Sequence, residues 1–258
     1  MSLVSPALSD IIDRLRAVGC VFAEDEARLL VSTARTPAEL AAMVDRRVHG
    51  LPLEHVLGWA EFCGLRIAVD PGVFVPRRRT EFLVRQAASL ARPGAVVVDL
   101  CCGSGAVGVA LAAAVHGIEL YAADVDPVAV RCARRNIGDR VFVGDLYDAL
   151  PAELRGRIDV LVANAPYVPT DAIDLMPPEA RVYEPRMALD GGADGLDVQR
   201  RVAAGAPNWL APGGHVLVET SARQAAQSMA TFAAHGLIPA AATSDELNGT
   251  VVIGTMPR

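Results

Sequence analysis

The sequence has few aromatic residues, no excess of positive charge and no pairing pattern among its cysteines. Aromatic side chains make up 5% of the 258 residues, and the formal net charge at pH 7 is −6. A protein that binds nucleic acid through bulk electrostatics needs the opposite charge balance, so we expect no direct nucleic-acid partner. The cysteines are odd in number, and no two have the Cys-x-x-Cys spacing of a zinc site: Cys20, Cys63, Cys101, Cys102 and Cys132. This pattern argues against a disulfide framework and against a metal centre, and it favours a reducing cytoplasm.

Long hydrophobic runs are absent too, and no basic-then-apolar leader opens the sequence. The most apolar stretch, Leu100–Val115, is interrupted by glycines and follows Asp99, which is typical of a protein core and not of a membrane span. Hydrophobic residues still make up 52% of the chain, enough for a sizeable core. We therefore expect a cytoplasmic protein with no membrane contact, built as one large domain or as a large and a small one.

What the sequence does contain is a glycine-rich turn between a buried strand and a helix of small residues. The strand ends at Asp99, and the turn that follows reads Gly103-Ser-Gly105-Ala-Val-Gly108. Glycines let the backbone approach a ligand closely, and the N–H groups that open the helix face that ligand. About twenty residues on, a second strand ends at Asp124, which suits an acid that accepts hydrogen bonds from ribose hydroxyls. The pattern indicates a nucleoside-type cofactor, but the glycines alone also satisfy the nicotinamide or flavin motif.

A second motif separates these cofactors. The strand Ile158–Ala163 runs directly into Asn164-Ala-Pro-Tyr167, an Asn-x-Pro-aromatic motif at the carboxyl end of a strand, where open α/β sheets place their ligands. Asp99 stands just before the glycine turn, the usual place for an acid that contacts the amino group of S-adenosylmethionine. A nicotinamide dehydrogenase would leave the Asn164–Tyr167 motif without a role. The two features therefore favour S-adenosylmethionine.

Strands and helices alternate from residue 95 onward, which predicts an α/β fold: a Rossmann-like, doubly wound, mostly parallel seven-stranded sheet. The predicted strands are Ala95–Leu100, Leu120–Asp124, Val141–Gly144, Ile158–Ala163, His215–Glu219, Leu237–Thr243 and Thr250–Gly254. The predicted helices of this part are Glu81–Leu90, Ala106–Val115, Pro127–Asn136, Asp197–Trp209 and Ala222–Ala234. The long connection Val168–Gly195 follows the Asn-x-Pro-Tyr motif directly, and loops in such a place often act as lids or contact the substrate.

The first fifty residues predict a small helical bundle of three helices, the third opened by Thr36 as N-cap, Pro37 and Glu39. Between the bundle and the sheet, the alternating stretch Glu61–Asp70, the turn Pro71-Gly72 and Val73-Phe-Val predict a β-hairpin. We therefore divide the chain into a helical domain (1–55), a hairpin linker (56–75) and a cofactor-binding domain (76–258).

At this point the chain resembles the HemK/PrmC family of protein-(glutamine-N5) methyltransferases, and the resemblance covers most of its length. It rests on the motifs named above together with Asp70-Pro-Gly-Val-Phe-Val-Pro-Arg77, Thr80-Glu81, Glu184-Pro-Arg-Met-Ala-Leu-Asp-Gly-Gly192 and Leu210-Ala-Pro-Gly-Gly214. The resemblance implies a helical substrate-recognition domain, a hairpin linker and a Rossmann-like catalytic domain. It also implies methyl transfer from S-adenosylmethionine to the glutamine of a Gly-Gly-Gln motif in a peptide-chain release factor.

The same resemblance implies a set of site residues. The expected cofactor contacts are Asp99, Cys101, Cys102, Gly103, Ser104, Gly105, Asp124, Asp145, Leu146 and Asn164, where Asp145-Leu146 would border the adenine or form a simple turn. The expected catalytic residues are Asn164, Ala165, Pro166 and Tyr167. In this hypothesis the Asn164 side-chain oxygen and the Ala165 carbonyl accept the two hydrogens of the acceptor amide, and Tyr167 packs against its plane.

Three departures from the family pattern mark a divergent branch and bear on the acceptor more than on the chemistry. Ala165 replaces the first proline of Asn-Pro-Pro-Tyr, Arg78-Arg79 replace Pro-Glu/Asp, and Cys101-Cys102 replace a glycine and a small or polar residue.

Several alternatives stay open at this stage. A base amino-methyltransferase of nucleic acids uses a similar motif, and a binding protein that has lost its substrate would keep the cofactor site. For single residues, Asp124 could instead cap the next helix, and Cys101-Cys102 could have a lowered thiol pKa or simply pack. Arg77–Arg79 could attract an acidic partner or be solvated, and His215 is expected to be structural.

Overall fold

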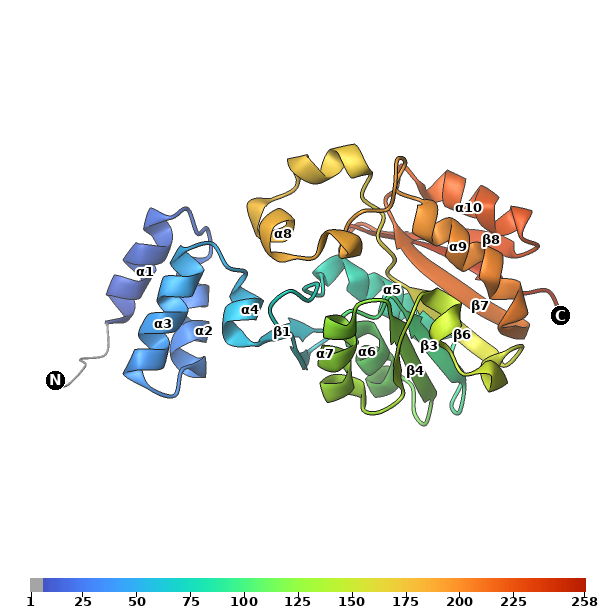
Figure 1. Ribbon diagram of the computed structural model, residues 1–258, viewed down its shortest axis with the longest axis horizontal. Helices are drawn as coiled ribbons and strands as arrows, with labels where there is room; N and C mark the ends of the chain where they lie inside the picture. The colour runs from blue at the N-terminus through green and yellow to red at the C-terminus, as the bar shows by residue number, and fades with distance from the viewer. Residues whose placement is uncertain (1–6) are drawn as a thin grey trace.

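The computed structural model describes residues 7–258, and its first part is a bundle of helices at one end of an elongated molecule (Figure 1). The helices are α1 (Leu8–Ala17), α2 (Ala23–Thr33), α3 (Pro37–Val48) and the short α4 (Leu53–Leu57). Apolar side chains such as Ile11, Leu30 and Val44 form a core of their own between them. At the start of α3 the Glu39 N–H donates to the Thr36 hydroxyl at 3.1 Å, as predicted, while the Glu39 carboxylate accepts from the N–H of Arg35. The sequence did not predict α4.

A two-stranded hairpin follows, but its strands differ from the predicted ones. Strand β1 (Trp59–Phe62) pairs antiparallel with β2 (Leu65–Ala68). The turn is Cys63-Gly64, whose φ angles of 51° and 72° are those of a primed hairpin turn. Pro71-Gly72 form the predicted turn, in which the Val73 N–H donates to the Asp70 carbonyl at 3.1 Å. This turn lies outside the hairpin, however, and the predicted strand after it is wrong.

The main part of the chain is a seven-stranded sheet in the order β5-β4-β3-β6-β7-β9-β8. All of its strands but β9 run in the same direction, and β9 is antiparallel to both of its neighbours, β7 and β8. This confirms the predicted Rossmann-like, doubly wound fold. The strands are β3 (Val96–Leu100), β4 (Glu119–Asp124), β5 (Val141–Val143), β6 (Ile158–Ala163), β7 (Leu210–Thr220), β8 (Ile238–Ser244) and β9 (Gly249–Thr255).

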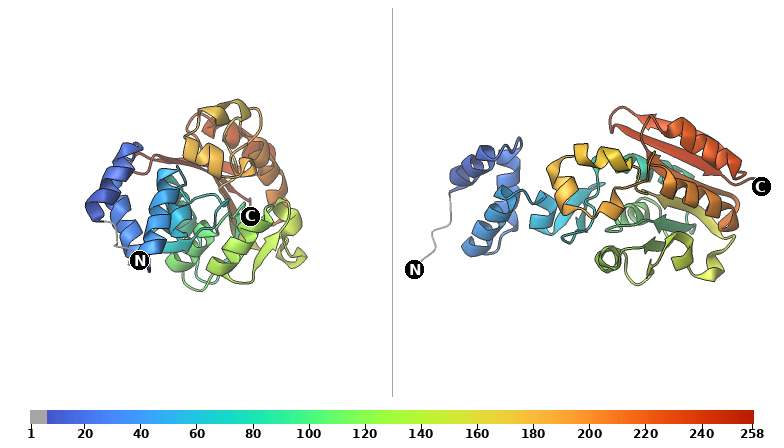
Figure 2. Two further views of the ribbon diagram at one scale, coloured as in Figure 1. Left: turned by 60° about the vertical axis from the view of Figure 1, so that its left-hand side comes forward. Right: turned by 45° about the horizontal axis from the view of Figure 1, so that its top comes forward.

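Helices cover both faces of this sheet (Figures 1 and 2). On one face α5 and α6 pack against Val97, Val160 and Leu217, and α7 packs beside them. On the other face α9 and α10 pack against a core that includes Leu161 and Val216. Their bounds are α5 (Glu81–Leu90), α6 (Ala106–Ala114), α7 (Pro127–Ile137), α9 (Asp197–Gly205) and α10 (Ala225–Ala234). Helix α9 ends before the predicted Trp209, and a 3-10 turn containing Pro207 follows it.

Residues 168–195, predicted as one long loop, contain the short helix α8 (Pro178–Tyr183) and two 3-10 turns. This segment reaches the helical bundle, and Figure 1 shows α8 above α4. Arg47 of α3 pairs with Glu179 at 2.6 Å, and the Tyr183 hydroxyl donates to the backbone carbonyl of His49 at 3.0 Å. The segment therefore connects the bundle to the sheet edge where β6 ends.

Candidate functional site

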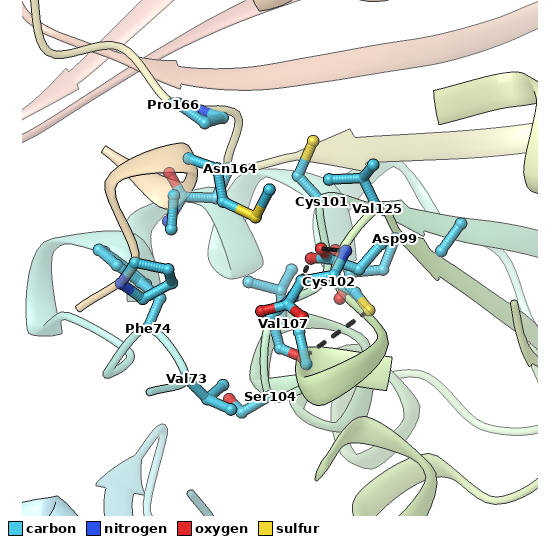
Figure 3. Close-up of a pocket in the computed structure, with 18 of the residues that line it drawn as sticks. Val73, Phe74, Asp99, Cys101, Cys102, Ser104, Val107, Val125, Asn164 and Pro166 are labelled. Carbon is cyan, nitrogen blue, oxygen red and sulfur yellow. Dashed lines mark hydrogen bonds between the residues drawn. The ribbon is translucent and has the colours of Figure 1, made fainter. Parts of the chain in front are cut away.

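A large pocket opens at the carboxyl ends of β3, β4 and β6, where parallel sheets of this type bind ligands. We call it the main pocket. It has a volume of about 1060 Å³, including the open space at its mouth. Figure 3 shows Phe74 across this pocket from Cys101 and Asp99. Every predicted cofactor residue except Gly105 lines it: Asp99, Cys101, Cys102, Gly103, Ser104, Asp124, Asp145, Leu146 and Asn164.

The floor of the main pocket is the glycine turn, which a carboxylate fixes in place. The N–H of Gly103 donates to Oδ2 of Asp124 at 2.8 Å, and the N–H of Asp126 donates to Oδ1 of the same residue at 2.9 Å. Burial raises the pKa of the Asp124 carboxyl, and these two hydrogen bonds oppose that rise. The N-cap of α7 is Asp126, whose carboxylate accepts from Val128, so the alternative role of Asp124 as helix cap is wrong.

Asp99 lies beneath the same turn and is 1% exposed. Its Oδ2 accepts a hydrogen bond from the N–H of Gly108 at 2.9 Å. Burial raises the pKa of the Asp99 carboxyl to about 7, and the nearby charge of Asp124 adds to that rise. A Cβ atom at Gly108 would stand 3.3 Å from Oδ2 of Asp99 and 3.2 Å from Leu120, so this glycine lets the helix approach the strand end closely.

Gly105, the exception, opens α6 on the far side of the turn. Its φ is 78°, and a Cβ atom there would lie 2.7 Å from a side-chain carbon of Ile137. The structure therefore places Gly105 at the packing of α6 against α7 and not in the pocket wall.

The two cysteines of the turn, which line the main pocket, have raised thiol pKa values. Burial raises the pKa of Cys101 and that of Cys102 well above the ordinary value, and the charges of Asp99 and Asp124 raise them further. The alternative of a lowered thiol pKa is therefore wrong. Cys101 has a φ of 54°, a left-handed conformation that a glycine adopts more readily.

Asp145 and Leu146 follow β5 on another wall of the main pocket. The Asp145 carboxylate accepts from the guanidinium of Arg201 at 2.7 Å. Leu146 is buried and has a φ of 48°.

Two other segments contribute walls that the sequence did not specify residue by residue. Val73, Phe74, Pro76 and Thr80 come from the chain between the hairpin and α5, and Pro185, Met187 and Ala188 come from the 168–195 segment. Both segments contain motifs of the family resemblance, so the sequence marked them as important. Neither motif shows which of its side chains point into the pocket.

A second cavity adjoins the main pocket at the Asn164–Tyr167 motif. Four residues line both spaces: Phe74, Asn164, Pro166 and Ala188. Nδ2 of Asn164 donates to Oγ1 of Thr80 at 3.5 Å, so the amide nitrogen of this side chain is engaged by the protein. Ala165 is 1% exposed and lines the second cavity but not the main pocket. Asn164 therefore stands at the junction of the two spaces.

Tyr167 lines the second cavity as well, and its ring is held at the hydroxyl. That hydroxyl donates to Oε1 of Glu219 at 2.9 Å, and the Arg79 guanidinium lies over the ring, 5.6 Å from its centroid. Burial and the neighbouring Glu219 raise the pKa of the Tyr167 hydroxyl.

The arginine cluster matches neither of its predicted roles as a whole. Arg77 donates to both oxygens of the buried Glu184 at 2.6 Å, and Arg79 pairs with the buried Glu219 at 3.1 Å. Only Arg78 of the three is an exposed side chain without an ion pair among residues 7–258. His215 is structural as expected, since its Nδ1 lies 3.0 Å from the Thr255 hydroxyl at the strand pair β7–β9.

Two absences hold for residues 7–258. No group of three or more histidine, cysteine or acidic side chains is placed to hold a metal ion. No helix in this range combines the length and hydrophobicity that a membrane span requires.

The fold and this site define a Rossmann-like methyltransferase, and comparison with known proteins agrees. The sequence model of the methyltransferase small domain family matches residues 64–189. The release factor glutamine methyltransferase of Geobacter sulfurreducens is 41% identical over 208 residues, which are 78% of this chain and 72% of that protein. The chain belongs to the HemK/PrmC family, that of the release factor glutamine methyltransferases, and the family implies S-adenosylmethionine as cofactor.

The chain is also similar to a second kind of methyltransferase and to a solved methyltransferase structure. A 4-amino-L-phenylalanine/4-methylamino-L-phenylalanine methyltransferase of Streptomyces pristinaespiralis is 39% identical over 203 residues, 75% of this chain and 69% of that protein. The crystal structure of a methyltransferase from Pyrococcus furiosus superposes with a TM-score of 0.58 at 18% identity, over 76% of this chain and 90% of that one. The second similarity concerns the fold alone.

Proposed function

We propose that this chain transfers a methyl group from S-adenosylmethionine to the side-chain amide nitrogen of a protein glutamine, in a peptide-chain release factor. The observation that carries the proposal is the position of Asn164, at the junction between the main pocket and the second cavity. A cofactor in one space and an acceptor in the other would meet at this residue. The relatives named as release factor glutamine methyltransferases support the choice of acceptor.

The main pocket suits S-adenosylmethionine in its donors, acceptors and apolar surface. Asp124, at the end of β4, offers carboxylate lone pairs to ribose hydroxyls, and the apolar walls around Leu146 suit the adenine. Asp99 lies beneath the glycine turn, where its carboxylate would face the cationic amino group. When bound, the cofactor supplies a methyl group on a positively charged sulfur.

The second cavity has groups suited to holding an amide. An amide nitrogen is a weak nucleophile because its lone pair is delocalised into the carbonyl, so its orientation decides the rate. Because Nδ2 of Asn164 donates to Thr80, its Oδ1 is the atom left to accept a hydrogen from the acceptor. The Ala165 carbonyl is the proposed second acceptor, reached through the cavity that Ala165 lines. Two such acceptors orient the nitrogen and stabilise the positive charge that develops on it.

The helical bundle is the proposed recognition domain for the protein acceptor. In this division the chain consists of a helical domain (1–55), a hairpin linker (56–75) and a methyltransferase domain (76–258). In support, the 168–195 segment contributes Met187 and Ala188 to the main pocket and contacts α3 through Glu179. The five free thiols support a reducing compartment such as the cytoplasm.

A second acceptor class has a specific observation in its favour. The relative from Streptomyces pristinaespiralis is named for an amine on an aromatic ring, and this chain has Ala165 where its family has proline. A planar aromatic amine could use the same two acceptors at the junction and stack on Phe74 or Tyr167.

The test is a transfer assay with radiolabelled S-adenosylmethionine and a lysate of cells that lack this gene. Label is counted separately in the protein fraction, in the nucleic-acid fraction and in small-molecule products separated from the unreacted S-adenosylmethionine. Label in one protein, mapped to a glutamine, is the expected result. Label in free amines favours the second acceptor class, label in nucleic acid overturns the protein acceptor, and no label in any fraction overturns the enzymatic proposal.

A further inference from the structure

A buried carboxylate, Glu219, holds two residues that line the second cavity, Arg79 and Tyr167. Glu219 lies near the end of β7 and is 2% exposed. Its Oε1 accepts from the Tyr167 hydroxyl at 2.9 Å and from Nε of Arg79 at 3.1 Å. Its Oε2 is buried and has no hydrogen-bond partner among residues 7–258.

Such an arrangement is costly for the fold. A carboxylate removed from water loses several kcal/mol of hydration, and its pairing recovers this only when the geometry is good and the other lone pairs are satisfied. Here one oxygen is unsatisfied, and the one cationic partner, Arg79, is 44% exposed at its side chain. An apolar residue at this core position of β7 would pack without that cost. A specific requirement for the carboxylate is the physical reason to keep it.

The two partners of Glu219 lie close in sequence to Thr80 and Asn164, the two residues joined by the hydrogen bond at the junction. Arg79 directly precedes Thr80, whose hydroxyl accepts from Asn164, and Tyr167 follows Asn164 by three residues. One carboxylate oxygen therefore joins the 3-10 turn Arg78–Thr80 to the loop after β6. Glu219 therefore fixes both chain segments that supply the Asn164–Thr80 contact.

The same part of the chain fixes Tyr167 a second time, through its backbone. Nε2 of Gln224, which precedes α10, donates to the Tyr167 carbonyl at 3.0 Å. The backbone carbonyl of Glu219 is itself held by Nε2 of Gln199 at 3.0 Å. Tyr167 is thus held at its hydroxyl by Glu219 and at its carbonyl by Gln224. Gln199 of α9 in turn holds the backbone of Glu219.

We propose that Glu219 is a positioning residue for methyl transfer, which acts through Tyr167 and Arg79 to hold Asn164 and the Tyr167 ring toward the acceptor. The inference rests on the proposed function, because it concerns how the acceptor amide is oriented. Glu219 lines neither pocket, so its proposed action runs through its two partners.

The test compares Glu219→Gln and Tyr167→Phe with the wild-type enzyme, using the acceptor that the transfer assay identifies. Gln keeps a hydrogen-bond acceptor for Tyr167 but removes the charge that pairs with Arg79, while Phe keeps the ring and removes the hydroxyl. We expect kcat to fall roughly tenfold in each variant, with the Kd for S-adenosylmethionine changed by less than about twofold. The double variant should lose much less than the product of the two single losses, because both remove one shared device.

The matched control is Glu246→Gln, which breaks the exposed ion pair with Arg85 and should leave kcat unchanged. A merely structural role of Glu219 would lower the melting temperature and leave kcat of the folded variant near the wild-type value, which would overturn the inference. If Glu219→Gln does not fold, Tyr167→Phe decides alone, since full kcat in that variant would also overturn it. Absence of transfer by the wild-type protein would instead count against the proposed function, so the two failures are distinguishable.

Discussion

Nδ2 of Asn164 donates a long hydrogen bond of 3.5 Å to Oγ1 of Thr80, which joins the loop after β6 to the start of α5 beside the junction of the two cavities. The nitrogen points to the protein, so the oxygen is the atom available to an acceptor. This assignment is the basis of the first prediction.

Asn164→Ala should lower kcat by about 10²–10³, because it removes an acceptor that orients the nitrogen and stabilises its developing charge. The Kd for S-adenosylmethionine should rise only a few fold by comparison, since the main pocket keeps its other walls. Thr80→Val is the companion variant: it keeps Asn164 but frees its amide to rotate, and it should cost roughly tenfold in kcat. Single-turnover rates with saturating cofactor measure both effects. Wild-type turnover in Asn164→Ala would contradict the assignment.

The raised pKa of Asp99 predicts that the folded protein becomes less stable as the pH rises. Its folded-state pKa of about 7 lies above the ordinary value of 3.8, so the folded protein binds more protons than the unfolded chain between these values. The free energy of unfolding should therefore fall as the pH rises from about 4 to about 7, by at most about 1.4 kcal/mol per pH unit from this group, and then level off. Denaturant titrations of the wild type and of Asp99→Asn measure the difference, which isolates Asp99 from the other carboxyls. Equal pH profiles would contradict the buried, proton-binding carboxyl.

The same group predicts a pH dependence of cofactor binding. If the Asp99 carboxylate faces the cationic amino group, the ionised form binds better, so affinity should increase up to about pH 7 and a proton should be released on binding below that pH. Calorimetry in buffers of different ionisation enthalpy measures the released proton. Asp99→Asn should release none.

Cys101 carries a backbone conformation that costs stability. At a φ of 54° a side chain with a Cβ atom is disfavoured by about 1 kcal/mol, and a β-branched side chain by more. Cys101→Gly should therefore remain within about 1 kcal/mol of the wild type, although glycine adds entropy to the unfolded chain. Cys101→Val should be destabilised by about 2 kcal/mol, and Cys101→Ala separates the lost thiol packing from the backbone effect. Chemical denaturation gives the order, and a valine variant as stable as the glycine variant would refute the strain.

The contact between the 168–195 segment and the bundle predicts a separable effect on protein acceptors. Glu179→Gln removes the ion pair with Arg47 and should cost less than about 1 kcal/mol, because the Glu179 side chain is 50% exposed. It should nevertheless raise KM for a protein acceptor and speed proteolytic cleavage within residues 168–195. Glu24→Gln, which breaks a pair with Arg16 inside the bundle, is the control and should do neither. Unchanged KM and cleavage in Glu179→Gln would show that this contact does not couple the bundle to the site.

The sequence predicted the sheet because each strand carries its own hydrophobic signal, and it predicted the glycine turn because the turn is local. It misplaced the hairpin: Pro71-Gly72 do form a turn, but the turn that joins the two paired strands is Cys63-Gly64, whose local signal is weaker. It also gave Glu219 no role, because the partners Tyr167 and Arg79 lie 52 and 140 residues away in the chain. Contacts over such separations depend on the packed fold and leave no periodic pattern.

The identity of the residue that receives the methyl group is the most direct test of the whole account. Purified protein, S-adenosylmethionine and a purified release factor with an intact Gly-Gly-Gln motif are incubated together, and the modified peptide is sequenced by mass spectrometry. The account predicts a single methyl group on the side-chain nitrogen of that glutamine, formed about 10²–10³ times more slowly when Asn164→Ala replaces the wild type. A methyl group on any other atom of the release factor, or a release factor that stays unmodified, would contradict it.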